Sequence, residues 1–226
     1  MPSGTANNIA YTLGLARKTL DQWVAGWMSA RRAKCTLGLA QGPWGSRNFI
    51  EGAGIGVFSD VMLRLDAREN IEIAHADGAD EKISSVLEML IAEAGAYPPR
   101  PLQVSLDGTD ISGDYVLLEA MNIKAIGPNL HLAPLADPGD DYFDVVCVSA
   151  DEREKLRTYL TACREDRIVP FDLTVRCGKH LQLAWDGFSV HIDDEAWHDA
   201  KENVPERSAE IDIQVEASTI SFLVPA

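Results

Sequence analysis

The sequence has few cysteines, and they are widely spaced. The four cysteines are Cys35, Cys147, Cys163 and Cys177. No two of them form a C-x-x-C pair, and disulfide frameworks or zinc sites need clustered cysteines. This spacing predicts scattered, reduced thiols in a cytosolic protein. A zinc site built from His191, Asp193 and His198 is a less favoured alternative, because no fourth ligand is evident.

Long apolar runs and basic residues are also scarce. The longest apolar runs, such as residues 115–121, are far shorter than a membrane-spanning helix. The first eight residues are polar and do not resemble a signal peptide. The 20 basic residues against 35 acidic residues give a net charge of −15. Such a surface repels nucleic acid and anionic bilayers, so we expect no nucleic-acid partner and only apolar or local membrane contact. The expected location is the cytoplasm, with peripheral membrane contact as an addition.

The composition is that of an ordinary globular protein. Apolar residues make up 46% of the chain and charged residues 24%. The length allows one domain or two small ones. Apolar spacing predicts helices in these segments: 9–15, 19–28, 59–65, 81–94 and 151–163. Alternating apolar residues bounded by turn residues predict several strands between and after these helices.

The candidate functional residues of the chain are concentrated in residues 113–148. An apolar strand over residues 115–120 is followed by Asn122, which stands alone among hydrophobic residues. Gly127 opens a Gly-Pro-Asn turn, residues 134–141 form a Pro/Gly/Asp loop, and a strand follows over residues 142–148. Polar residues therefore collect where strands stop, which is where a rigid sheet presents a site on its loops.

The spacing of Asn122, Gly127, Pro134, Ala136 and Asp140 resembles the C-terminal half of the diacylglycerol-kinase-like lipid kinases. That family includes the sphingosine kinases and is related in fold to the NAD kinases. Its usual pattern is an Asn, a glycine cluster, Pro-x-Ala and Asp-Gly before an apolar strand. Here the glycine cluster is Gly-Pro-Asn, and the Asp-Gly has become Asp140-Asp141.

Three further matches follow the family order. Residues 4–7, Gly-Thr-Ala-Asn before a helix, resemble the hinge motif that helps hold nucleotide phosphates, and a helix N-terminus favours anions. The simpler alternative is that Thr5 or Asn7 caps the helix. Residues 52–61, with three close glycines, resemble the strand that borders the lipid headgroup pocket. Residues 193–195, Asp-Asp-Glu, take the place of the family's Asp-Gly-Glu, which lies near the nucleotide and its metal.

The resemblance implies an α+β fold. We expect a mostly antiparallel, two-layer β domain, like the C-terminal domain of the NAD kinase and diacylglycerol kinase fold, with flanking helices. Residues 1–32 would be a helical hinge remnant, and residues 33–226 a β-rich substrate-binding domain. The Gly-Gly-Asp-Gly-Thr loop of the family's nucleotide-binding domain is absent from the sequence. We therefore expect a truncated or internally started reading frame, or a chain that has lost its partner domain.

The resemblance also implies roles for individual residues, with ATP as the phosphoryl donor and Mg²⁺ as the cofactor. The nucleotide-binding candidates are Gly4, Thr5, Asn7, Arg64 and Arg68. The substrate-binding candidates are Asp60 and Asn122, although Asp60 could equally be an N-terminal residue of its helix. The catalytic candidates are Asp193 and Glu195. The metal-binding candidates are Asp140, Asp193 and Glu195.

Simple strand geometry supports part of this assignment. If the strand before Asp193 continues, Asp193 and Glu195 point to one face and Asp194 to the other. Mg²⁺ prefers hard carboxylate oxygens and usually takes one or two from protein. Asp141 and Asp194, however, each replace a family glycine.

Two classes of function follow. The first is the C-terminal portion of an ATP-dependent lipid kinase of phospholipid metabolism, a transferase acting on a lipid hydroxyl such as that of diacylglycerol. Such a chain alone should have little or no activity. A separate nucleotide-binding domain or chain would complete it, and a homodimer is a further possibility. The alternative, motivated by Asp141 and Asp194, is a non-catalytic lipid-binding or partner-docking module. An NAD kinase is a third possibility, distinguished by its acceptor.

Overall fold

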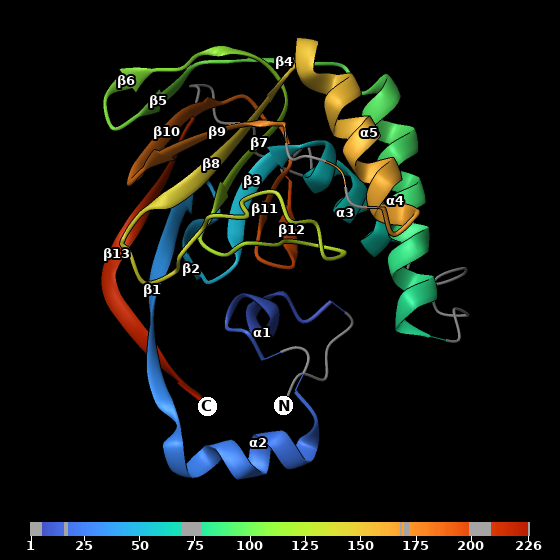
Figure 1. The fold of residues 1–226 in the computed structure, drawn as a ribbon. Helices are drawn as coiled ribbons and strands as arrows, with labels where there is room; N and C mark the ends of the chain where they lie inside the picture. Colours follow the sequence, from blue (N-terminus) through green and yellow to red (C-terminus); the bar gives the residue numbers. More distant parts are fainter. Residues whose placement is uncertain are drawn as a thin grey trace.

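The fold consists of two antiparallel β-sheets packed face to face, with helices on the outer side of one sheet (Figure 1). The computed structural model describes residues 6–15, 18–68, 78–167, 169, 172–198 and 209–225, without the side chains of residues 66–68. The predicted α+β fold with a mostly antiparallel two-layer β domain is confirmed.

One sheet, here sheet A, carries the long strands of the chain. Its order is β2 (Gly45–Phe49), β1 (Arg31–Gly42), β13 (Ala209–Val224), β10 (His180–Trp185), β5 (Val104–Leu106) and β6 (Thr109–Asp110). The spacing of apolar and turn residues predicts a hairpin of strands 35–40 and 47–52, and β1 and β2 form it with β1 longer and β2 ending at Phe49. It also predicts two final strands, 211–215 and 220–224, whereas β13 is one continuous strand whose pairing with β1 shifts register between Thr36 and Gly38.

Sheet B contains the most deeply buried strands of the chain, β3 and β7. Its order is β12 (Glu195–Trp197), β11 (Val190–Ile192), β3 (Gly52–Gly56), β7 (Gly113–Met121), β8 (Phe143–Ser149) and β9 (Thr174–Gly178), and β4 (Arg100–Leu102) also pairs with β7. Residues 115–121 of β7 are buried on both faces. A central strand covered on both sides reads as a continuous apolar run rather than an alternating one.

Alternation along the strands divides the core into two layers. Leu118 of β7 and Val145 of β8 face sheet A, where Phe49 and Phe143 stack with ring centroids 5.4 Å apart. Leu117 and its neighbours on the opposite face meet the helices. The helices over that face are α3 (Val57–Arg68), α4 (Ala79–Ala96), η3 (Ala150–Glu152) and α5 (Arg153–Arg164). Figure 1 shows α4 and α5 side by side.

The N-terminal segment lies at the other end of the molecule. Its helices are α1 (Asn8–Thr12), α2 (Leu20–Gly26) and the 3₁₀ turn η1 (Trp27–Ser29). A small cluster of Leu15, Trp23, Ala33 and Val224 joins them to the ends of β1 and β13. Figure 1 shows α2 at the far end of these two strands. The boundary between residues 32 and 33 stays a prediction.

Candidate functional site

The turn between β2 and β3 is held by the carboxylate of Asp193. Its Oδ1 accepts hydrogen bonds from the backbone N–H of Glu51 at 2.7 Å and of Gly52 at 3.2 Å, and its Oδ2 accepts one from Ile50 at 3.0 Å. The backbone N–H of Asp193 in turn donates to the Gly52 carbonyl at 2.8 Å. Burial raises the pKa of this carboxyl, and the three backbone bonds oppose part of that rise. The carboxylate of Asp193 thus fixes the backbone of a turn.

Asn122 ties the same turn to β1. Its side chain is almost fully buried, and its Nδ2 donates to the carbonyl oxygens of Thr36 at 2.8 Å and Ile50 at 3.0 Å. Its backbone N–H donates to the Glu51 carbonyl at 2.9 Å. The buried polar side chain noted in the sequence therefore uses both amide hydrogens to join three chain segments.

The helix α1 docks on this turn through Asn8. The Asn8 Nδ2 donates to Glu51 Oε2 at 3.2 Å and to the Gly127 carbonyl at 3.1 Å. Burial raises the pKa of Glu51; the bond from Asn8 opposes that rise, and the nearby Asp193 and Asp194 add to it. Asn7, the residue before α1, has a left-handed backbone with φ 55°. Of the predicted phosphate motif, Gly4 and Thr5 lie outside the described residues.

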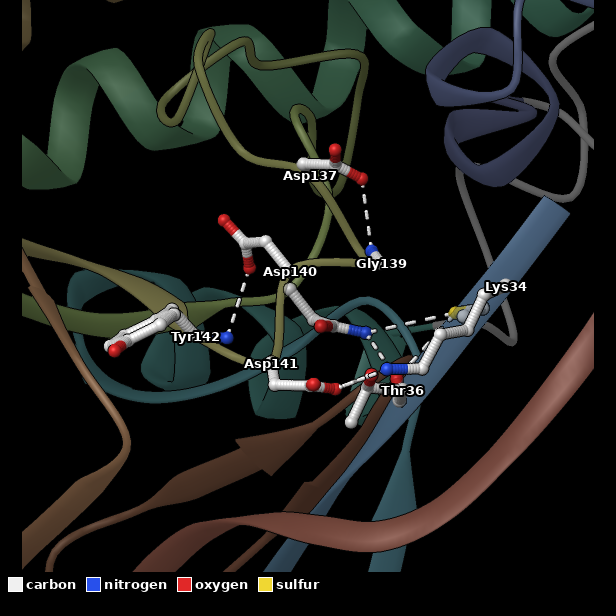
Figure 2. A network of polar contacts seen from close by, with 9 residues as sticks. Lys34, Thr36, Asp137, Gly139, Asp140, Asp141 and Tyr142 are labelled. Atoms are coloured by element: carbon white, nitrogen blue, oxygen red, sulfur yellow. Dashed lines mark hydrogen bonds and ion pairs between the residues drawn. The ribbon is translucent and has the colours of Figure 1, made fainter.

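The loop of residues 134–141 is held by local hydrogen bonds of its aspartates and by several bonds to β1, one of them from the Thr36 N–H to the Pro138 carbonyl at 2.8 Å. Asp137 Oδ1 accepts from the Gly139 N–H and Asp140 Oδ1 from the Tyr142 N–H, each at 2.9 Å (Figure 2). Asp141 Oδ1 lies 2.6 Å from both Lys34 Nζ and Thr36 Oγ1. These two partners hold the pKa of Asp141 below its ordinary value. With φ 64°, Asp141 occupies a backbone conformation that favours glycine.

The strand before Asp193 does not continue through residues 193–195, so the condition for Asp193 and Glu195 to share a face is not met. The strand β11 ends at Ile192, Asp193 and Asp194 form a tight turn, and β12 begins at Glu195, which pairs with Ile192. Asp193, and not Asp194, has the positive φ of 52°. The turn sends the Asp193 carboxylate to the β2–β3 turn and the Glu195 carboxylate to an exposed ion pair with Arg47 at 3.0 Å.

The three predicted metal ligands are therefore not brought together as a set. Asp193 is bound by backbone N–H groups, Glu195 by Arg47, and Asp140 by its own loop. Among the described residues, no three His, Cys, Asp or Glu side chains are arranged to hold a metal ion. This also leaves the zinc alternative around His191 without structural support.

Asp60 lies at the opposite end of β3 from this turn. Its Oδ2 accepts from the Tyr97 hydroxyl at 2.7 Å and lies 3.6 Å from an Arg100 nitrogen, and the Ser189 hydroxyl donates to its Oδ1. Burial of the Tyr97 hydroxyl raises its pKa, and the hydrogen bond from Arg100 opposes that rise. The net effect is a pKa of about 12 for Tyr97. The carboxylate of Asp60 therefore anchors the start of α3.

The two arginines predicted to contact nucleotide lie in α3. Arg64 forms an ion pair with Glu93 of α4. The side chain of Arg68 lies outside the described part of the chain. The structure thus brings Asn122, Asp193 and the N-terminal end of α1 together at the β2–β3 turn. Asp60 and Arg64 lie at the other end of β3.

Sequence reasoning missed a buried acid–base pair. Glu119 Oε2 lies 2.7 Å from His191 Nε2, and neither side chain is exposed. Gly54 lies between them in the strand register, and a Cβ at this glycine would overlap the Glu119 carboxylate. The glycines of β3 thus admit a close approach, as predicted, but the approaching group is a carboxylate of the same chain. An acidic residue inside the apolar run of residues 115–121 was the available signal.

Residues 59–209 match the model of the YegS C-terminal NAD kinase beta sandwich-like domain. The chain belongs to this family. The matched region of this YegS-type domain includes Asn122, Asp140, Asp193 and Glu195, whereas Asn8 and the β2–β3 turn precede it.

Solved structures share the fold of the YegS-type domain. A structure described as "a putative diacylglycerol kinase from Bacillus anthracis str. Sterne" is 18% identical with a TM-score of 0.62. A second structure so described is 16% identical, and one described as a diacylglycerol kinase from the same organism is 17% identical, both with a TM-score of 0.58. Each alignment covers 95% of this chain but only 64% or 65% of the other. No protein with a curated description shows significant sequence similarity.

Proposed function

We propose that this chain is the C-terminal portion of an ATP-dependent lipid kinase, which moves the γ-phosphoryl group of ATP to a lipid hydroxyl such as that of diacylglycerol. The observation that carries the proposal is the β2–β3 turn, where α1, Asn122 and Asp193 meet through direct hydrogen bonds. Asn122 and Asp193 come from two motifs that resemble the lipid kinases, and Asn8 of α1 directly follows a third, residues 4–7. The family assignment and the fold shared with the Bacillus anthracis proteins support the same function.

Phosphoryl transfer depends mainly on positioning and on electrostatic stabilisation of the transferring group. We assign Asp193 and Asn122 as positioning residues, because their polar atoms are occupied by backbone partners. Glu195 is the better candidate for direct contact with the reacting groups, since its side chain is 69% exposed and, among the described residues, pairs only with Arg47. Asn7 and the residues before it would border the nucleotide phosphates.

ATP and Mg²⁺ belong to this proposal as requirements of the assembled kinase. The structure does not fit a common metal site for Asp140, Asp193 and Glu195, because their carboxylates have separate partners. The proposed phosphoryl transfer therefore does not depend on a metal ion held by these three residues alone. Arg64 and Arg68 stay candidates for the nucleotide phosphates.

A non-catalytic lipid-binding or partner-docking module is the second candidate function. The observation that favours it is the use of the predicted catalytic carboxylate of Asp193 as a backbone clamp. Asp141 and Asp194, which replace family glycines, point the same way. On this alternative the chain would bind lipid or a protein partner without transferring phosphate.

An activity assay with two proteins separates these functions. The purified chain is mixed with Mg-ATP and diacylglycerol in detergent micelles, and phosphatidic acid is measured, with NAD as a second acceptor. We expect no product from the chain alone. We expect product from a fusion in which the N-terminal third of a Bacillus anthracis relative precedes the chain. Product from the chain alone would refute the need for that domain.

A folded fusion that binds ATP and diacylglycerol but forms no product would support the binding module. In that case the double variant Asp141→Gly/Asp194→Gly asks whether the two aspartates are lesions. A gain of activity would identify the chain as a kinase domain that has decayed, and unchanged inactivity would leave the module as the better assignment. Phosphorylated NAD in place of phosphatidic acid would point to an NAD kinase.

A further inference from the structure

The outer face of α2 and η1 is apolar and exposed. Leu20, Val24, Trp27 and Met28 have 58%, 61%, 48% and 98% of their surface exposed. Their spacing of four, three and one residues places them along one side of a helix. Trp23, which borders this side of the helix next to Trp27, is buried against the ends of β1 and β13. A soluble protein that turns the apolar side of a helix outward presents a contact surface.

This helix is held away from the sandwich on a two-stranded ribbon. Residues 31–36 of β1 pair with residues 219–224 of β13, whereas β2 pairs only with residues 38–42 and β10 only with residues 209–214. Leu223, 50% exposed, lies opposite Arg32 on this ribbon. Figure 1 shows α2 projecting at the end of the ribbon.

Basic side chains adjoin the apolar face. Arg31 and Arg32 open β1, one residue after the end of η1, and both are exposed. Neither forms an ion pair with a carboxylate in the part of the chain that the structure describes. A hollow of about 320 Å³ beside them is lined by Thr12, Arg31, Arg32, Lys34, Asp137 and Gly139, among others. In a chain with a net charge of −15, a local excess of free cations is a distinctive feature.

We propose that Leu20, Val24, Trp27, Met28, Arg31 and Arg32, here called the α2 surface, dock the chain on an anionic lipid bilayer. Apolar and tryptophan side chains insert at the headgroup boundary, and arginines bind lipid phosphates. The acidic remainder of the chain is repelled by the same bilayer, so this end approaches first. The inference rests on the proposed function in one respect: a lipid kinase must reach a lipid substrate that lies in a bilayer.

Vesicle binding tests the α2 surface without catalysis. The purified chain is sedimented with vesicles of phosphatidylcholine, with and without phosphatidylglycerol, in low and high salt and in the absence of ATP and diacylglycerol. We expect binding only to the anionic vesicles and weaker binding in high salt. The variant Leu20→Ser/Val24→Ser/Met28→Ser should bind roughly tenfold more weakly. Arg31→Gln/Arg32→Gln should lose at least about tenfold as well.

The control variant is Leu135→Ser, because Leu135 is 88% exposed in the loop of residues 134–141 and lies outside the α2 surface. It should bind like the parent, and circular dichroism should show that all variants are folded. No vesicle binding, equal binding to neutral vesicles, or equal losses in the control would overturn the proposal. Self-association that the α2 variant abolishes, seen by sedimentation velocity without vesicle binding, would make the surface a protein interface instead. Because no substrate is present, failure here leaves the kinase assignment untouched.

Discussion

Glu119 and His191 meet across Gly54 inside sheet B, with 2.7 Å between Glu119 Oε2 and His191 Nε2. Gly54 has no side chain, so the carboxylate and the imidazole can close over the middle strand. Within the described residues, Glu119 Oε1 has no hydrogen-bond partner. Removing one member of such a buried pair is strongly destabilising, because the other member is left buried without the partner that offsets its loss of hydration.

Replacing Gly54 with alanine should destabilise the fold by about 3 to 5 kcal/mol, because the new Cβ overlaps the Glu119 carboxylate and separates it from His191. Urea unfolding would measure the free-energy change. Gly78→Ala is the matched control, since no heavy atom of the described residues lies within 4 Å of a Cβ at that extended glycine. A loss at Gly54 no larger than at Gly78 would contradict the assigned role of the glycine.

The stability that this pair contributes should fall as the pH rises. Burial alone would lower the pKa of His191, but the contact with Glu119 outweighs it and raises the pKa above 6.5. Burial also raises the pKa of Glu119. Both shifts mean that the folded state holds protons that the unfolded chain has released. The contribution of His191 is thus complete below pH 6.5 and is lost as the pH rises through the folded pKa.

The variant Glu119→Gln tests this pH dependence of stability, because it removes the carboxylate charge that raises the pKa of His191. The difference in unfolding free energy between parent and variant should shrink between about pH 6 and pH 8, by at most about 1.4 kcal/mol per pH unit. Urea titrations at a series of pH values would measure it. A difference that grows or stays constant over this range would show that His191 is neutral in the folded protein.

Asp193→Ala should cost about 3 kcal/mol, because it leaves the partly buried backbone N–H groups of residues 50–52 without their acceptor and places alanine at a positive φ. Asp194→Ala changes the exposed neighbour in the same turn and should cost less than about 0.5 kcal/mol. Thermal or urea unfolding would compare the two. Equal costs would mean that the turn does not depend on the carboxylate of Asp193.

Asp60→Ala separates an anchoring role from a lipid-binding role. The change removes the acceptor for Ser189 and Tyr97 at the start of α3 and should destabilise the chain by about 2 kcal/mol. Asp60→Asn keeps an acceptor oxygen and should cost about half as much. Unchanged stability together with weaker diacylglycerol binding would instead support the predicted role in the substrate pocket.

Local patterns were sufficient to predict much of the fold. The helix α4 follows from apolar spacing, and Asp107-Gly108 and Asp186-Gly187 mark turns where the structure has them. Asn122 stood out because a polar residue among hydrophobic ones requires partners. The motif spacing also led to the correct family, because it reflects the order of strands and loops in the whole domain.

Long-range pairing accounts for what the sequence could not reveal. Asp193 bonds residues 141 to 143 positions away, so no local signal marks it as the residue that caps the β2–β3 turn. His191 lies 72 positions from Glu119, and only the order of β11, β3 and β7 makes them neighbours. The tight turn at Asp193 and Asp194 has the same cause, since this turn is stabilised by bonds to another part of the chain.

Glu195 and Glu154 provide a matched test of catalysis. Both glutamates are 69% exposed and pair with arginines that are 51% exposed. The ion-pair distance is 3.0 Å for Glu195 and 3.3 Å for Glu154. Of these two, only Glu195 is close in sequence to Asp193, whose carboxylate binds the β2–β3 turn. In the fusion with an N-terminal nucleotide-binding domain, Glu195→Gln should lower the rate of lipid phosphorylation about a hundredfold. Glu154→Gln should leave it unchanged, and neither variant should alter the unfolding midpoint appreciably, because exposed ion pairs contribute little stability. Equal rates for the two variants would remove Glu195 from the reaction and leave Asp193 and Asn122 as supports of a site whose catalytic groups lie elsewhere.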